Sequence, residues 1–456
     1  MSSAQFTARQ RRLVLVLVMA IIVVFSTLTG FIVTSLQGLQ GVSPPPTVTV
    51  VWETPTAWPT TTAAAEPEED VLSQVQAARL FYQIAHQVES VRGLVPRSQV
   101  PLSFLGSQDM AQAVRRIQTE RDPQSQLRPY MLLGLFPEVP VRVRIHSVVG
   151  MYVPEQRQLY IATERQGSDV DNQALLARAY AHALLDQTFD FGSLDARATT
   201  TDARLATRAL VEGDATLLTS IYLYDDPARV NWDYLATLIS ENEWVGYGTG
   251  LDSSATMSHL QRFPYWEGPH FALALYEAGG WEVINRAYTD PPRTTEQVLH
   301  PERYLLERDN PGSVNVPDLS DLLGEGWTTV LEDTMGELVV GLYLAQDLPQ
   351  VTAWQAADGW DGDKLKVFEH PDGQRVTVWR TGWDSRVDAT EMEQALVSQV
   401  PQRFLPVVPV RPVHGLGGVW WRVSEGAISV SRAGRYVTLV RAPDLKTLAE
   451  IREILP

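Results

Sequence analysis

An uninterrupted apolar segment near the N-terminus constrains this chain more than any other feature. Residues 13–36, LVLVLVMAIIVVFSTLTGFIVTSL, contain no charged side chain. As a helix that rises about 1.5 Å per residue, the segment would reach roughly 36 Å, which exceeds the roughly 30 Å of a bilayer's hydrocarbon core. The sequence therefore predicts a single-pass transmembrane helix in the lipid bilayer, and a chain divided between two compartments.

The charges that flank this segment predict its orientation. Arg9, Arg11 and Arg12 precede it, and the next charged residue is Glu53. Because basic residues are retained on the cytoplasmic side, residues 1–12 are expected to be a cytoplasmic tail and all later domains to be extracytoplasmic, at the cell membrane. A cleaved signal peptide is the alternative, but it has a shorter apolar region and ends at an A-x-A site. No such site closes this segment.

Composition narrows the classes of function open to the rest of the chain. The 456 residues, of which 45% are hydrophobic, suffice for two or three domains. A net charge of −17 argues against a nucleic-acid partner, because phosphate binding requires a basic surface. The absence of cysteine excludes disulfides, thiol catalysis and Cys-ligated metals, so any metal site must use His, Asp and Glu.

Patterning after the apolar segment predicts a linker followed by two domains of an α+β protein. Residues 37–71 are rich in Pro and Thr and are expected to form a semi-extended tether. Residues 72–310 have the apolar spacing of long helices, with one β-hairpin at about 149–164. Residues 311–456 mix helices with hairpins, such as the one that turns at Asp372-Gly373, and are predicted to be a separate α+β domain.

One predicted helix, at about 171–188, has a histidine in a pattern typical of metallopeptidases. Its sequence ARAYAHALLDQTFDF places His182 where the second histidine of an H-E-x-x-H zinc motif would stand. The first histidine position holds Arg178, and the position of the catalytic glutamate holds Ala179. Glu212, in the next predicted helix, could be a third ligand, and Asp186 could orient the His182 imidazole.

Several segments in matching order make this chain resemble the gluzincin-type zinc metallopeptidases, many of them membrane-anchored in bacteria. The family's helix, H-E-L-T-H-A-L-x-D-Q-x-F-D, corresponds here to RAYAHALLDQTFD, and its E-G-D-A motif to residues 212–215. VRGL (91–94), GMYVPEQRQLY (150–160) and a long segment at 263–304 are similar to further family motifs. The resemblance, which extends over roughly residues 72–440, implies a zincin-like helical domain and peptidase ancestry.

The departures from that family predict a site without peptidase chemistry. Only His182 and Glu212 carry over as zinc ligands, whereas an arginine cannot ligate a cation and an alanine cannot accept a proton. We therefore expect no catalytic residue and no cofactor, with the guanidinium of Arg178 in place of the zinc charge beside Glu212. The predicted function is that of a membrane-anchored pseudopeptidase, which binds an extended peptide or an envelope or secreted protein by β-addition at the 150–160 hairpin.

Two alternative functions remain open at this point. A rebuilt zinc site could join His182 and Glu212 to His270 or His300 and keep the chain an active metallopeptidase. The chain could instead be a purely structural envelope protein. His300 could approach the cleft, although packing or capping of its Pro-flanked turn is the simpler interpretation. Glu267 and His270, three residues apart on a predicted helix, could form a second metal site.

Three further features have simple structural interpretations. The stretch DGWDGD at 358–363 is rich in carboxylates but lacks the ligand spacing of an EF-hand calcium loop, so it is expected to be a turn. Trp420-Trp421 is predicted to pack within a sheet rather than to bind sugar. His86 is predicted to be a packed or surface residue of a helix that ends at Gly93.

Overall fold

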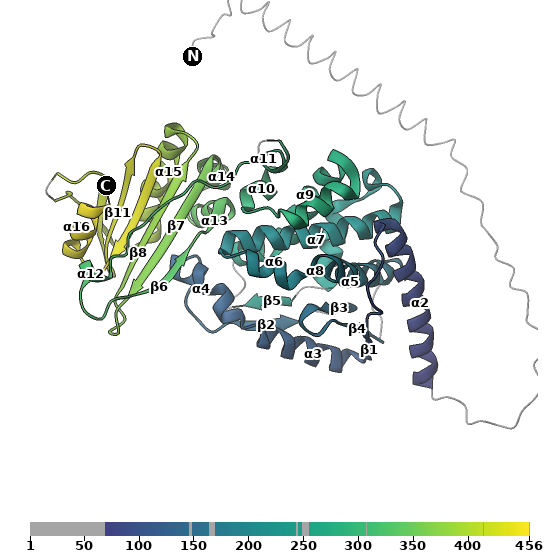
Figure 1. Cartoon of the computed structure of the whole chain (residues 1–456). Helices are drawn as coiled ribbons and strands as arrows, with labels where there is room; N and C mark the ends of the chain where they lie inside the picture. Colours follow the sequence, from purple (N-terminus) through teal and green to yellow (C-terminus); the bar gives the residue numbers. More distant parts are fainter. Residues whose placement is uncertain are drawn as a thin grey trace, which may run out of the picture. The chain divides into compact units, whose positions relative to one another are not determined.

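The computed structural model describes residues 69–145, 148–163, 169–242, 245–248, 255–306, 308–413 and 415–455. These residues contain both long helices and sheets, which confirms an α+β fold (Figure 1). The predicted cytoplasmic tail and transmembrane helix, and nearly all of the linker, lie outside them. Among the helices that are described, none has the length and apolar character needed to cross a membrane.

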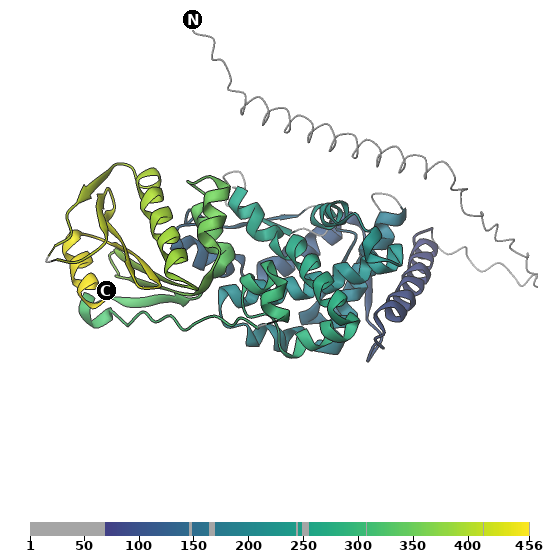
Figure 2. The same cartoon turned by 90° about the horizontal axis from the view of Figure 1, so that it is seen from above.

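The first part of the chain contains four long helices, of which α2 lies at the outer edge (Figure 2). They are α2 (Glu69–Arg92), α5 (Asp169–Phe189), α7 (Thr201–Tyr224) and α9 (Ala255–Thr289). The helices predicted at 171–188 and 203–224 are thus confirmed, whereas α9 begins earlier than the predicted residue 268. The predicted interruption of α9 is confirmed, because Gly279 and Gly280 have non-helical backbone angles. Shorter helices complete this part: α6 (Phe191–Arg197), α8 (Trp232–Asn242), α10 (Thr295–Leu299) and α11 (Pro301–Leu305).

Two glycines bring α7 and α9 unusually close together. A β-carbon added at Gly213 of α7 would overlap the carbonyl oxygen of Gly268 on α9. A β-carbon added at Gly268 would likewise overlap the carbonyl oxygen of Ala209. Because any side chain at either position would push the backbones apart, these glycines set the separation of the two helices next to Glu212.

A small sheet lies beside α5. Its strand order is β1 (Leu102–Leu105), β4 (Gln158–Ala162), β3 (Gly150–Val153), with β1 parallel to β4 and β3 antiparallel to it. The hairpin predicted at about 149–164 is confirmed as β3 and β4, joined by a short 3-10 turn. The remaining elements here are α3 (Ser107–Glu120), α4 (Pro123–Leu133) and a two-stranded pair, β2 (Arg142–Ile145) with β5 (Val245–Gly248).

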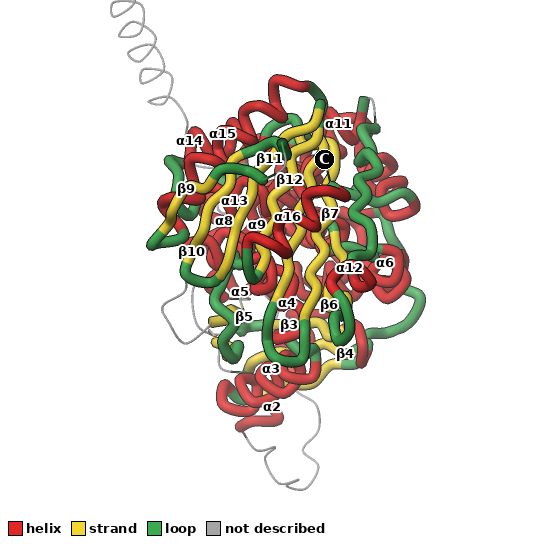
Figure 3. The backbone as a smooth tube through the Cα atoms, turned by 90° about the vertical axis from the view of Figure 1, so that its left-hand side faces the viewer, coloured by secondary structure: helices red, strands yellow, loops and turns green. Residues whose placement is uncertain are grey.

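The C-terminal part is a seven-stranded antiparallel sheet in the order β6-β7-β8-β12-β11-β10-β9 (Figure 3). The predicted hairpin with its turn at Asp372-Gly373 is confirmed, as β7 and β8. The strands are β6 (Thr328–Asp333), β7 (Trp360–Glu369), β8 (Arg375–Trp383), β9 (Val407–Val410), β10 (Val419–Val423), β11 (Gly426–Ala433) and β12 (Tyr436–Ala442).

Helices cover both faces of this sheet, because side chains alternate across each strand. Trp421 packs in the main core with α13 (Gly336–Leu344), α14 (Gln350–Ala357) and α15 (Arg386–Arg403). Its neighbour Trp420 packs in a second core with α16 (Leu445–Ile454), next to the short α12 (Ser320–Leu323). Both tryptophans are buried, which confirms their predicted role in sheet packing.

The predicted domain boundary at residues 310/311 marks a change from helices to sheet within one compact unit, Pro67–Pro456. The main apolar core contains Leu210 and Ile284 from the helical part together with Trp379 from the sheet. Polar contacts also cross the boundary, since Asp333 at the end of β6 accepts hydrogen bonds from the N–H and the hydroxyl of Thr201 (2.8 and 2.5 Å). The start of α7 is therefore fixed by the C-terminal part.

Candidate functional site

The site predicted on α5 is assembled around one carboxylate. Arg178 and His182 lie one turn apart on α5, and both contact Glu212 of α7. The Arg178 guanidinium forms an ion pair with Oε2 of Glu212, and His182 Nε2 lies 3.3 Å from the same oxygen. The predicted pair between Arg178 and Glu212 is thus confirmed.

Burial and charge act in opposite directions on Glu212. Burial alone would raise its pKa, because the charged form loses water. The positive charge of Arg178, followed by His182 and then Arg208, more than offsets burial and holds the pKa well below that of an ordinary glutamate. Arg208, which is half exposed, reaches the other oxygen at 3.8 Å. Glu212 is therefore ionised throughout the physiological pH range.

The surroundings of Arg178 are those of a structural cation. Its side chain is only 2% exposed, its Nε lies 3.5 Å from the hydroxyl of Thr216, and its guanidinium lies 5.6 Å from the ring centroid of Tyr265. An aromatic face and a carboxylate together compensate a buried guanidinium. Arg178 is accordingly a fixed positive charge between α5, α7 and α9.

Ala179, which the resemblance aligns with the catalytic glutamate of zinc peptidases, lies against the edge strand of the small sheet. Ala179 is buried, and a β-carbon added at Gly150 of β3 would lie 3.2 Å from the Ala179 β-carbon. Glycine therefore permits β3 to run directly alongside α5 at this point. The sequence predicted neither this contact nor its closeness.

Asp186, which was predicted to orient the His182 imidazole, bonds other groups instead. Its carboxylate accepts a hydrogen bond from the Tyr152 hydroxyl (2.7 Å) and another from the Phe191 N–H (2.8 Å), and neither partner is His182. Asp186 thus ties β3 and the start of α6 to the end of α5. A carboxylate one turn after His182 can bond either the imidazole or groups on neighbouring elements, so the spacing alone did not determine the partner of Asp186.

Two other motifs of the family resemblance meet in a buried ion pair. Arg92, of the VRGL segment, donates two hydrogen bonds to Asp214 of the segment at 212–215 (3.1 and 3.0 Å). Asp214 also accepts from the Tyr288 hydroxyl (3.0 Å), and the Arg92 guanidinium stacks 4.4 Å from the Trp281 ring. This network anchors α2 and α9 to α7, two residues after Glu212.

The residues at this site do not fit the zinc ion that the family resemblance implies. His182 and Glu212 are two of the three ligands required, and the third position holds a permanently charged guanidinium. Of the histidines considered for a rebuilt site, His270 faces Glu267 (3.7 Å) and His300 faces Glu337 (3.1 Å). Within the described residues, the groups of three or more potential ligands include neither His182 nor Glu212. The chemistry available here is therefore ionic pairing.

Three further predictions, for His86, residues 358–363 and His300, can be compared with the structure. His86 is exposed on α2 and lines a depression of about 780 Å³. The stretch 358–363 is a turn only at its start, since β7 begins at Trp360. His300 is the residue between α10 and α11; its backbone N–H caps the end of α10, whereas its side chain makes no capping hydrogen bond and contacts Glu337 instead. The sequence did not indicate that Glu337 of α13 and Asp358, at the end of α14, lie beside His300.

The comparison with family profiles gives a match in the C-terminal part of the chain. A family profile described as "Domain of unknown function (DUF8575)" matches residues 326–452. These residues include the seven-stranded sheet and α13 to α15. No curated protein and no solved structure matches the chain.

Proposed function

We propose that this chain is a membrane-anchored pseudopeptidase that holds an extended peptide segment on the extracytoplasmic side of the membrane without cleaving it. The observation that carries the proposal is the ion pair of Arg178 with Glu212. By the resemblance to zinc peptidases, this ion pair would stand in place of the zinc ion. A fixed guanidinium cannot activate water, and Ala179 cannot take its proton.

The proposed binding surface is the outer edge of β3. Among the described strands, none pairs with that edge. The N–H of Ala162 donates to the carbonyl of Val149 (2.9 Å), so the alternation of an antiparallel ladder turns the backbone groups of Gly150 and Tyr152 away from β4. An extended peptide can pair with these groups, since strand addition uses main-chain hydrogen bonds.

The position of this edge relates it to the former catalytic centre. Because Gly150 contacts Ala179, a peptide paired with β3 passes α5 at the turn that contains Arg178 and His182. His182 is partly exposed and offers a polar contact beside the strand. Ionic pairing and strand addition thus occur together where cleavage would take place in an active peptidase.

Single-amide hydrogen exchange on the purified full chain tests this proposal. We expect a mixture of extended ten-residue peptides to slow exchange at the Gly150 and Tyr152 amides. The Met151 amide is the internal control, because its N–H already faces β4.

The other outcomes separate the alternatives. Hydrolysis of the peptides in the presence of Zn²⁺ would contradict the proposal and favour an active peptidase. Unchanged exchange at both edge amides, with the peptides intact, would instead favour a structural envelope protein.

A further inference from the structure

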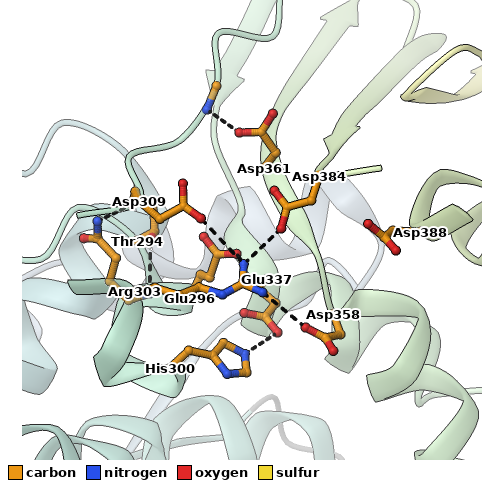
Figure 4. A network of polar contacts seen from close by, with 12 residues as sticks. Thr294, Glu296, His300, Arg303, Asp309, Glu337, Asp358, Asp361, Asp384 and Asp388 are labelled. Atoms are coloured by element: carbon orange, nitrogen blue, oxygen red, sulfur yellow. Dashed lines mark hydrogen bonds and ion pairs between the residues drawn. The ribbon is translucent and has the colours of Figure 1, made fainter. Parts of the chain in front are cut away.

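A second ionic cluster, remote from Glu212 in sequence, lies where the helical part meets the C-terminal part (Figure 4). Its carboxylates surround Arg303 of α11 and come from α10, α13, the end of α14 and the loops beside α11 and β8. They belong to Glu296, Asp309, Glu337, Asp358 and Asp384. The cluster therefore has far more negative charge than one guanidinium can balance.

The half of the cluster formed by Glu296, Asp309 and Asp384 already has a cation, the guanidinium of Arg303. Nη1 of Arg303 forms an ion pair with Glu296 and lies 3.8 Å from Asp309 and 3.3 Å from Asp384. Burial nevertheless raises the pKa of Glu296 to about 9, with Arg303 opposing and the other carboxylates adding to the rise. The guanidinium thus occupies the space between these three groups.

The other half has three potential ligands and less positive charge. A ring nitrogen of His300, a carboxylate oxygen of Glu337 and one of Asp358 all lie within 4.8 Å of one another. The nearest guanidinium nitrogen, Nη2 of Arg303, is 3.5 Å from Asp358. Figure 4 shows the Glu337 carboxylate directed toward His300 and Asp358.

Glu337 gives independent evidence that this half receives a ligand. The residue is only 3% exposed, and its Oε2 has no hydrogen-bond partner. Its other oxygen is 3.1 Å from His300 Nε2. A buried carboxylate oxygen without a partner is costly, and a coordinated cation would remove that cost.

We infer that His300, Glu337 and Asp358 bind a divalent transition-metal ion. One imidazole nitrogen and two carboxylates are ligands typical of Zn²⁺ or Mn²⁺, whereas Ca²⁺ and Mg²⁺ prefer oxygen alone. Asp358 is exposed, so the ion can enter from solvent and keep water as a further ligand. Since the three ligands come from α11's N-terminus, α13 and the end of α14, the ion would join the helical part to the sheet.

Zinc binding to the full chain, purified in detergent and stripped of metal with EDTA, tests the inference. We expect one Zn²⁺ per chain by titration calorimetry, with a rise in melting temperature. His300→Ala and Asp358→Asn should each weaken binding at least tenfold. Asp358 is exposed, so its variant remains folded and informative even if His300→Ala destabilises the chain.

Two control variants assign the bound ion to this site. His270→Ala removes a comparable half-exposed histidine that faces a glutamate, and His182→Ala removes the histidine beside Glu212. Both should bind Zn²⁺ as the unchanged chain does. The inference is overturned if the unchanged chain binds no Zn²⁺, if His300→Ala and Asp358→Asn bind it normally, or if Ca²⁺ binds as tightly as Zn²⁺. Loss of zinc only in His182→Ala would instead contradict the pseudopeptidase proposal.

Discussion

Removal of the Arg178 guanidinium tests the central claim about the α5 site. At an effective dielectric constant of about 20, opposite charges at about 3 Å attract by about 5 kcal/mol. In Arg178→Ala the Glu212 carboxylate keeps His182 and the half-exposed Arg208 as neighbours, and it is itself 12% exposed. We therefore expect a loss of about 3 kcal/mol, at the lower end of the range for breaking a buried ion pair.

Thermal unfolding at pH 7 measures this loss. With an unfolding entropy of about 2.1 cal/mol/K per residue, cooperative unfolding of Pro67–Pro456 gives a fall in melting temperature of about 4 °C. Arg208→Ala is the matched control, because it removes an exposed cation 3.8 Å from the same carboxylate and should cost less than about 1 kcal/mol. A melting temperature of Arg178→Ala within 1 °C of the unchanged chain, or an equal loss in Arg208→Ala, would refute the reasoning.

The pH dependence of the same variant gives a second test. Because the pKa of folded Glu212 is lowered, its stabilisation is present above the ordinary glutamate pKa of about 4.3 and is lost as the pH falls toward the folded pKa. Without Arg178, burial should raise that pKa. The difference in melting temperature between the two proteins should therefore narrow from pH 6 to pH 3.5; a constant difference would show that lost packing, not charge, explains the effect.

Three further variants test other parts of the structure. Arg178→His supplies a third zinc ligand at the α5 site, so in a His300→Ala background it should bind one Zn²⁺ that His300→Ala alone does not, as measured by metal content. Gly213→Ala should cost about 3 kcal/mol by pushing α7 from the α9 backbone, whereas Gly417→Ala, in open space, should leave the denaturation midpoint unchanged. Burial raises the pKa of Asp202 to about 8, so the folded state holds an extra proton between about pH 4 and pH 8 and loses stability as the pH rises through that window. Asp202→Asn should remove this loss, seen as a smaller fall in melting temperature from pH 5 to pH 8.

Elements with strong local signals were predicted from the sequence. The helices α5 and α7 show apolar residues at helical spacing over more than four turns, and the β7–β8 hairpin has an Asp372-Gly373 turn. Shorter strands were missed, among them β1 and β9, because four residues contain too little periodicity to distinguish a strand from a loop. The parallel pairing of β1 with β4 also joins distant segments, which no local pattern indicates.

The candidate site was only partly predictable, and the reason is chemical. By their side-chain types alone, Arg178 cannot ligate a cation and Ala179 cannot accept a proton, wherever the helix lies. The partner of Arg178 was inferred from a family resemblance, and the packing of α5 on α7 bears it out. Asp186 had the expected spacing, yet its carboxylate bonds Tyr152 of β3 and the N–H of Phe191 at the start of α6, two partners that only the packing brings to it.

The sequence by itself therefore determined the types of the long elements, the side-chain chemistry at positions 178 and 179, and the apolar character of residues 13–36. The tertiary structure alone decided which charged groups meet. In the sequence, His300 was a possible ligand of a rebuilt zinc site, whereas Asp358 belonged to a carboxylate-rich stretch expected to be a turn. No pattern joined the two residues. Only the packing of the sheet against the helices places them beside the buried Glu337. Side-chain chemistry is a property of each residue, whereas the distance between residues far apart in the chain depends on the whole core.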